Sequence, residues 1–167
     1  MELGKASWDK RDCRKGKPVK EIQKILFPID FSEKIDALLP WVATLVEKFG
    51  ATLHVIFVTP DLADFTAFHA PAGNIQQFQE QALQAAKEKM AGVSKEVFKD
   101  FPKVATHVTV GSPAEKIVEF AKQEHIDLII MGTHGRKGLE RTIFGSVCDK
   151  VVRNAPCPVL TINPFQK

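Results

Sequence analysis

Short apolar runs alternate with longer amphipathic segments from Glu21 to the end of the chain. Near-continuous apolar runs occupy residues 25–29, 53–58 and 126–131, and each is too short for a helix but typical of a strand buried on both faces. Residues 104–110 and 158–162 are also predicted as strands, the first from its alternation and the second from its apolar composition. The pattern therefore predicts five strands.

A helix is predicted between the first two strands. Apolar side chains recur on one helical face of residues 35–49, which Ser32 can cap and Gly50 can end. Pro40 lies inside this segment and is expected to kink the helix or to delay its regular part, because an interior proline removes a hydrogen bond.

Three further helices are predicted in the second half of the chain. A long one is expected over about 75–98, after a loop at 61–74. Ser112-Pro113-Ala114-Glu115 is a capping box with proline at the first helical position, and it predicts a helix to about residue 124. The last helix is expected to bury four apolar side chains: Val147, Cys148, Val151 and Val152.

Strands and helices that alternate in this way predict an open, doubly wound α/β domain, with a five-stranded parallel sheet and helices on both faces. Ligands of such sheets bind at the carboxyl ends of the strands, where the strand order reverses. The loops after Ile29, Val58, Val110 and Met131 are therefore the places to search for a site.

Composition and charge divide the chain into an extension and a body. Residues 1–20 hold seven Lys/Arg against three Asp/Glu, a net +4, whereas the remaining residues, 21–167, hold 16 basic and 17 acidic groups. We expect a flexible basic extension on a single domain, because seven charges without interleaved aromatic residues are a weak indication of nucleic-acid binding. No apolar run is long enough to predict a membrane span. Three cysteines without metal-binding spacing favour a reducing cytoplasm.

The strongest chemical pattern is glycine-rich and follows the fourth predicted strand. Glycines stand at 132, 135, 138 and 145, the last beside Ser146, and Arg136 and Lys137 add positive charge. Glycines allow a close approach to the backbone, and a helix N-terminus presents free amides, so the pattern favours phosphate binding. The alternative is a tight turn in which the glycines serve geometry alone. Neither G-x-x-x-x-G-K-[ST] nor G-x-G-x-x-G occurs here.

The spacing Gly132-x2-Gly135-x9-Gly145-Ser146 resembles the ATP-binding motif of the universal stress protein family. Other matches follow in the same order along residues 20–163: Pro28-Ile-Asp30 with Ser32, Val58 at a strand end, Gly111-x-Pro113-Ala-Glu115, Asp127 to Arg136, and Ala155-Pro-Cys-Pro-Val159. The resemblance implies strand order 3-2-1-4-5. It also implies a homodimer paired through the last strand, Val159–Ile162.

The resemblance also implies a role for each site residue. Asp30 would hold the ribose of ATP, or of AMP or ADP, and Pro28 and Ile29 would flank the nucleoside. The backbone of Val58 would meet adenine, in a pocket lined by Met131 and Gly132. The phosphates would meet the residues at the glycine motif: Gly135, Arg136, Gly145, Ser146 and Val147. Mg²⁺ is expected to accompany the triphosphate through the phosphates themselves.

Three functions fit the sequence to different degrees. The first is a nucleotide-binding stress or regulatory protein. The second is an enzyme, an ATPase or a nucleotidyl transferase, but no acidic residue lies in the glycine loop before Glu140 and no catalytic residue is assigned. At most weak hydrolysis is expected. The third is an interaction module without nucleotide. His134 is interpreted as a loop residue, Asp30 has helix capping as its alternative role, and Met131 and Val58 have ordinary core packing as theirs.

Overall fold

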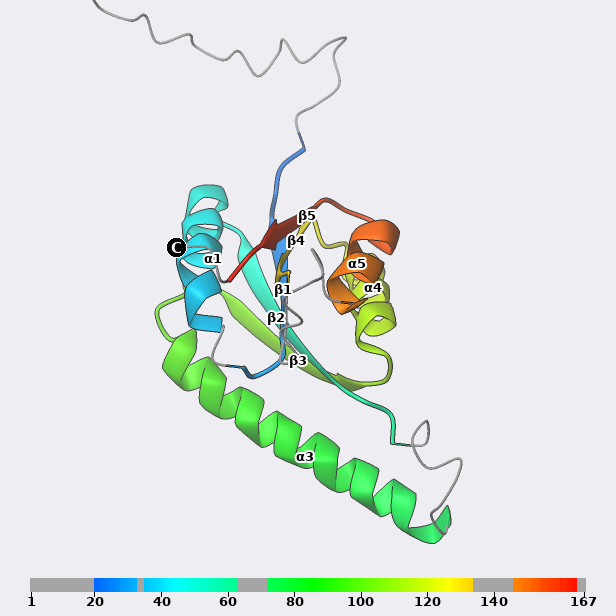
Figure 1. The fold of residues 1–167 in the computed structure, drawn as a ribbon. Coiled ribbons are helices and arrows are strands. Elements are labelled where there is room, and N and C mark those ends of the chain that lie inside the picture. Colours follow the sequence, from blue (N-terminus) through cyan, green and yellow to red (C-terminus); the bar gives the residue numbers. More distant parts are fainter. Residues whose placement is uncertain (1–19, 33–34, 63–71, 134–145, 165–167) are drawn as a thin grey trace, which may run out of the picture.

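A computed structural model describes residues 20–32, 35–62, 72–133 and 146–164. Five strands and four helices are described in this part of the chain (Figure 1). In chain order they are β1 (Lys24–Ile29), α1 (Ile35–Phe49), β2 (Thr52–Thr59), α3 (Ala72–Val97), β3 (Val104–Val110), α4 (Pro113–Gln123), β4 (Leu128–Gly132), α5 (Ser146–Asn154) and β5 (Val159–Ile162).

The strands form one parallel sheet in the order β3-β2-β1-β4-β5, which confirms the predicted fold class and strand order. The central strand β1 pairs with β2 on one side and with β4 on the other. The chain therefore adds β2 and β3 on one side of β1, then crosses the sheet and adds β4 and β5 on the other side. The strand order reverses between β1 and β4, which is where a doubly wound sheet offers a ligand site.

Two apolar layers cover the sheet, one on each face. On one face, α1 and α3 pack over strand residues that include Ile25, Phe27 and Leu53. On the other face, α4 and α5 pack over the alternate residues, among them Leu26 and Ile56 (Figure 1). Consecutive residues of β1 thus enter opposite layers, which explains why the central strands are apolar throughout.

Helix α1 ends just before Gly50, as the sequence predicts. Gly50 adopts a left-handed φ of 62°, its N–H donates to the Glu47 carbonyl, and the Ala51 N–H donates to the Val46 carbonyl. These two bonds form a Schellman motif, which satisfies carbonyls at the helix end. Helix α1 already begins at Ile35 and continues through Pro40, so the proline does not delay the start of the helix.

Three details of the predicted helices are wrong. Helix α3 begins at Ala72, inside the segment predicted as a loop. Ser112 is the N-cap of α4, but its side chain makes no capping bond, and Pro113 with its fixed φ begins the helix. Val152 is 45% exposed rather than buried, because one step around the helix from the buried Val151 turns it to the solvent.

Candidate functional site

The carboxyl ends of three adjacent strands lie together at one edge of the sheet. Ile29 ends β1 opposite Phe57 in β2, and Asp30 follows it. Met131 and Gly132 end β4, which lies on the other side of β1. The fold thus brings the predicted ribose residue and the predicted adenine residues to the same edge, at the point where the strand order reverses.

Asp30 begins a tight turn. Its Oδ1 atom accepts a hydrogen bond from the Ser32 N–H at 3.0 Å, and the intervening Phe31 has a left-handed φ of 56°. The Ile35 N–H, the first of α1, donates in turn to the Ser32 carbonyl at 3.3 Å. The carboxylate therefore stabilises the turn that leads to α1, through an amide that precedes the helix. This bond to Oδ1 is compatible with a carboxylate that also accepts from a ligand, since a carboxylate has about four lone-pair sites.

The apolar residues of the candidate site are part of the core. Val58 is 8% exposed and Met131 is 5% exposed, and both belong to the layer under α4 and α5. Ile29 is equally buried but belongs to the opposite layer, and Pro28 is half-buried. Core packing thus explains why these side chains are apolar, without any need for a ligand. A ligand at the strand ends would chiefly meet their backbone groups.

Helix α5 begins with Ser146, which is exposed, and Val147 packs at the margin of the α4–α5 layer. Since α5 follows β4 and leads to the parallel strand β5, its N-terminus lies at the same edge as Asp30. The amides and the positive end of its dipole are suited to phosphate. Gly135, Arg136 and Gly145 lie outside the described residues.

Two polar residues at this edge received no role from the sequence. Thr59 and Thr133 are each 7% exposed and directly follow Val58 and Gly132. The Thr59 carbonyl accepts from the Gly111 N–H at 2.9 Å, and the Thr133 N–H donates to the Ile162 carbonyl at 2.9 Å. The sequence signal that could have indicated both threonines is a polar residue directly after the apolar run of a strand.

The cysteine of α5 is packed rather than reactive. Burial, together with the negative charge of Asp149, raises the pKa of the Cys148 thiol to about 11, so the thiolate is disfavoured at neutral pH. Burial also raises the pKa of Cys157. The first observation agrees with the burial predicted for Cys148.

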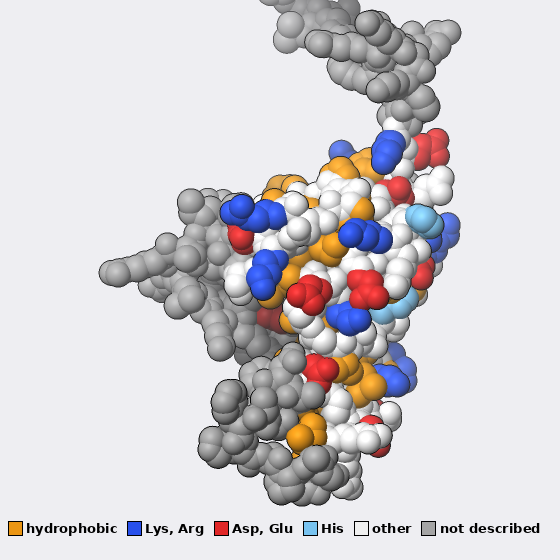
Figure 2. Space-filling model, turned by 90° about the vertical axis from the view of Figure 1, so that its right-hand side faces the viewer, with side chains coloured by type: hydrophobic (Ala, Val, Ile, Leu, Met, Phe, Trp, Pro, Cys, Tyr) orange, Lys and Arg blue, Asp and Glu red, His pale blue; other side chains and the backbone are white. Residues whose placement is uncertain are grey.

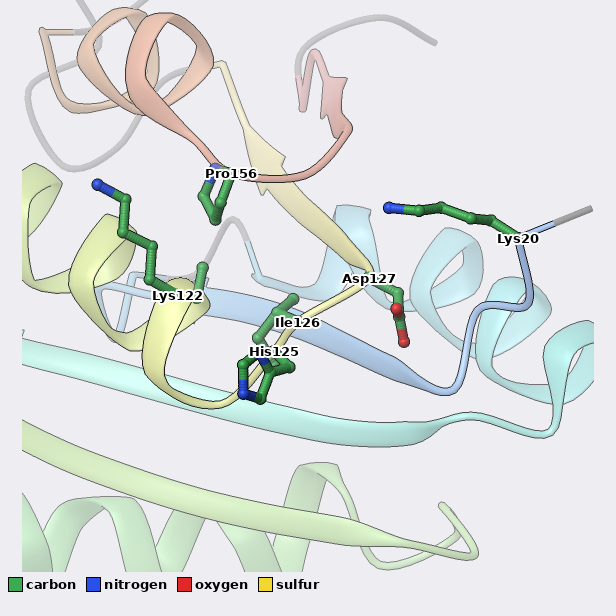
Figure 3. A pocket seen from close by; sticks show the side chains of 7 residues that line it. Lys20, Lys122, His125, Ile126, Asp127 and Pro156 are labelled. Atoms are coloured by element: carbon green, nitrogen blue, oxygen red, sulfur yellow. The ribbon is translucent and has the colours of Figure 1, made fainter. Parts of the chain in front are cut away.

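A hollow of about 300 Å³ lies at the opposite, amino edge of the sheet (Figure 3). Lys20 and Lys122 lie on opposite sides of it, with His125 and Pro156 between them. Asp127 also lines it, but its Oδ2 atom accepts from the N–H groups of Gln23 and Lys24, so it fastens the segment before β1 to β4. This hollow is distant from the strand ends described above.

The part of the chain that the structure describes shows no patch of one charge sign over α4 and α5 and no metal-binding cluster. On the face over α4 and α5, basic and acidic side chains intermingle (Figure 2). Among the described residues, no three His, Cys, Asp or Glu side chains gather closely enough to hold a metal ion. No described helix has both the length and the apolar character needed to cross a membrane.

The chain is similar to proteins of one family. The profile described as the universal stress protein family matches residues 21–163. Universal stress protein MJ0531 of Methanocaldococcus jannaschii is 34% identical over 145 residues, covering 87% of this chain and 84% of the relative.

Solved structures agree in fold. Protein MJ0577, from the same archaeon, has a TM-score of 0.76 at 29% identity, covering 89% of this chain and all of the other. A universal stress protein from Archaeoglobus fulgidus, solved in complex with dAMP, has a TM-score of 0.58 at 21% identity, covering 86% of this chain and all of the other. With the fold and the matched residues in agreement, this chain belongs to the universal stress protein family.

Proposed function

We propose that this protein binds an adenine nucleotide, ATP foremost, at the carboxyl edge of its sheet, and that it has a regulatory role in the stress response. The observation that carries the proposal is the convergence of the Asp30 turn, the ends of β2 and β4, and the N-terminus of α5 where the strand order reverses. The dAMP complex of the Archaeoglobus protein supports it, since that relative has the same fold.

Each part of the site is suited to one part of the ligand. The Asp30 carboxylate would accept hydrogen bonds from the ribose hydroxyls, with Pro28 and Ile29 beside it. The backbone of Val58 would meet the polar edge of adenine, and Met131 and Gly132 would line the base. The amides and hydroxyl at Ser146 and Val147 would meet the phosphates, together with Gly135, Arg136 and Gly145.

Mg²⁺ would enter with the triphosphate. This ion keeps several waters and is usually held through one or two carboxylates and the phosphates themselves. The position of the ion would therefore be set by the nucleotide rather than by a dedicated carboxylate cage of the protein. Any hydrolysis is expected to be slow, because no positioned nucleophile or base has been assigned.

The proposed assembly is a homodimer formed through β5. Among the described strands, this one lies at an edge of the sheet and pairs with β4 alone. Its Leu160 side chain is 37% exposed. An edge strand with unpaired backbone groups and an exposed leucine is suited to pairing with a second copy. The cytoplasmic location predicted from the cysteines belongs to the same proposal.

Thermal unfolding with and without nucleotide tests the proposal. At a ligand concentration about 100 times its dissociation constant, binding stabilises the native state by about 2.7 kcal/mol. Mg-ATP should raise the unfolding temperature more than Mg-GTP does, and AMP should also raise it. Protein freed of co-purified nucleotide that shows no shift with any adenine nucleotide would overturn the proposal.

A matched pair of variants identifies the site. Asp30→Ala should weaken ATP, ADP and AMP alike, because the ribose is common to all three. Asp36→Ala removes an exposed carboxylate from the first turn of α1 and should leave affinity unchanged. A loss of ATP but not AMP in Asp30→Ala would contradict the ribose assignment.

A further inference from the structure

Phe31 has a backbone conformation that is unusual for its side chain. Its φ of 56° lies in the left-handed region, where a bulky L-residue is disfavoured by contact between its Cβ and the backbone. Phe31 stands between Asp30, the proposed ribose residue, and Ser32, whose N–H donates to the Asp30 carboxylate. A disfavoured conformation at this position persists only if the surroundings hold it.

Two elements hold the Phe31 ring. The Phe57 ring of β2 lies against it, with a centroid separation of 4.2 Å and an angle of 38° between the planes. The Lys89 Nζ atom of α3 lies over it, 5.0 Å from the ring centre. Aromatic pairs and a cation over a ring face are both attractive, so the ring is anchored to the strand beside it and to the helix above it.

The anchored ring fixes the turn that presents Asp30. The left-handed residue ends the extended chain of β1 and redirects it, which lets the Asp30 side chain reach the Ser32 N–H and lets the Ser32 carbonyl reach the first amide of α1. If the ring were released, the residue would relax toward a favoured φ and the carboxylate would lose its partner. The direction of the carboxylate therefore depends on a side chain that points into the α1–α3 layer.

We propose that Phe31 is a positioning residue for the nucleotide site, with its ring held between Phe57 and Lys89 so that Asp30 is preoriented toward the ribose. This inference rests on the proposed function, since it assumes that Asp30 meets the ribose. It gives α3 a part in ligand binding, because Lys89 belongs to that helix.

Three variants separate positioning from general stability. Phe31→Ala removes the ring but keeps a Cβ that disfavours the left-handed φ, and Phe31→Gly removes the ring but allows it. Phe101→Ala is the matched control, because Phe101 is also half-buried and contacts one aromatic ring, Phe98, at 5.6 Å, but lies just before β3 at the opposite edge of the sheet.

Calorimetric titration with ATP and with AMP should show both Phe31 variants weakened by roughly tenfold, the scale of a lost preorganisation. Phe31→Gly should unfold at a higher temperature than Phe31→Ala without regaining the affinity, because strain is relieved but the turn is not held. Phe101→Ala should lower the unfolding temperature and leave affinity near wild type. Wild-type affinity in both Phe31 variants, or an equal loss in Phe101→Ala, would overturn the inference.

Amide hydrogen exchange without ligand keeps the two proposals distinguishable. The Ser32 amide should exchange faster in Phe31→Ala than in the wild type or in Phe101→Ala, because its bond to Asp30 depends on the turn. Unchanged exchange would overturn the positioning role even if nucleotide binds. Faster exchange in a protein whose wild type binds no adenine nucleotide would overturn the proposed function and leave the control of the turn by Phe31 intact.

Discussion

At the scale of single residues, two histidines share a hydrogen bond inside the sheet. His54 of β2 is 7% exposed, and its Nδ1 atom lies 3.2 Å from the Nε2 atom of His107 in β3. The ring planes are inclined by only 8°, and the Phe120 ring of α4 lies 4.5 Å from the His107 ring. One nitrogen must donate and the other accept, so this bond needs at least one of the two rings to be neutral.

Acid should therefore destabilise the fold. Burial lowers the pKa of both histidines below 6.5; for His54 the positive charges of His107 and Lys24 add to this, while the Glu124 carboxylate opposes it for both. Because the unfolded chain binds these protons more readily, the stabilisation is complete above pH 6.5 and is lost as the pH falls through the lowered values. Urea unfolding at about pH 7.5 and about pH 5 measures this loss.

Two variants assign the acid sensitivity. His107→Gln should reduce the difference in unfolding free energy between the two pH values, because one of the titrating pair is gone. His125→Gln replaces an exposed histidine outside the pair and should keep the wild-type difference. An unchanged acid loss in His107→Gln would show that other groups cause it.

Two glycines offer a test of backbone conformation free of steric clashes. A Cβ atom would meet nothing within 4 Å at either Gly50 or Gly92, but only Gly50 has a left-handed φ. Gly50→Ala should lower the free energy of unfolding by about 1 kcal/mol, through strain alone. Gly92→Ala, inside α3, should raise it by up to about 1 kcal/mol, because alanine favours helix. Urea unfolding of both variants checks the opposite signs.

At the scale of elements, α3 contacts the chain after two site-forming strands. Lys89 lies over Phe31 after β1, and the Gln79 side chain accepts from the Leu62 N–H at 2.8 Å after β2. Gln79 Nε2 also lies 3.5 Å from the Pro60 carbonyl. The helix thus supports the turns beside the proposed ribose and adenine residues.

Gln79→Ala should speed amide exchange at Leu62, because the amide loses its acceptor. Gln79→Glu retains an oxygen at the same position and should largely preserve the protection. Gln76→Ala is the control, since Gln76 bonds to Glu80 on the surface of the helix. Equal exchange in all three variants would show that Gln79 does not hold this turn.

The elements themselves were largely readable in the sequence, because their signals are local. The alternation at Val104–Val110 and the apolar run before Asp30 need only the period of a buried strand. The start of α3 was missed because Ala72-Gly73-Asn74 after a proline is typical of a loop, and tertiary context overrode that preference.

The site was only partly readable, for a different physical reason. The strand-end positions of Asp30 and Met131 follow from the alternation of elements. The left-handed Phe31 could not be foreseen, because phenylalanine does not favour that conformation and its partners come from distant elements. Likewise, the bond between His54 and His107 depends on the register of β2 against β3, which spacing in the sequence does not reveal.

At the scale of the whole molecule, the two outermost strands of the sheet, β3 and β5, differ in how they are covered. Edge strand β3 is flanked by α3 and by Phe120 of α4, whereas β5 is a strand of four residues with Leu160 partly exposed. The proposed dimer therefore depends on β5. Leu160→Lys should convert a dimer into a monomer, because a charge at a pairing edge opposes strand addition.

Light scattering after size-exclusion chromatography measures this change in mass. Phe78→Lys is the control, since Phe78 is 57% exposed on α3, away from β5. A Leu160→Lys protein that remains dimeric would contradict pairing through β5.

The two apolar layers have a consequence for how the sequence can evolve. Because the backbone of the sheet separates them, a volume change such as Val46→Ala in α1 and another such as Val151→Ala in α5 do not share a cavity. Their costs in stability should therefore add, whereas changes within one layer should interact. Substitutions in one apolar layer can therefore accumulate and be compensated within that layer, without changes in the other. A lineage could remodel the α4–α5 side around a new ligand while the α1–α3 side, with Phe31 inside it, preserves the turn that carries Asp30.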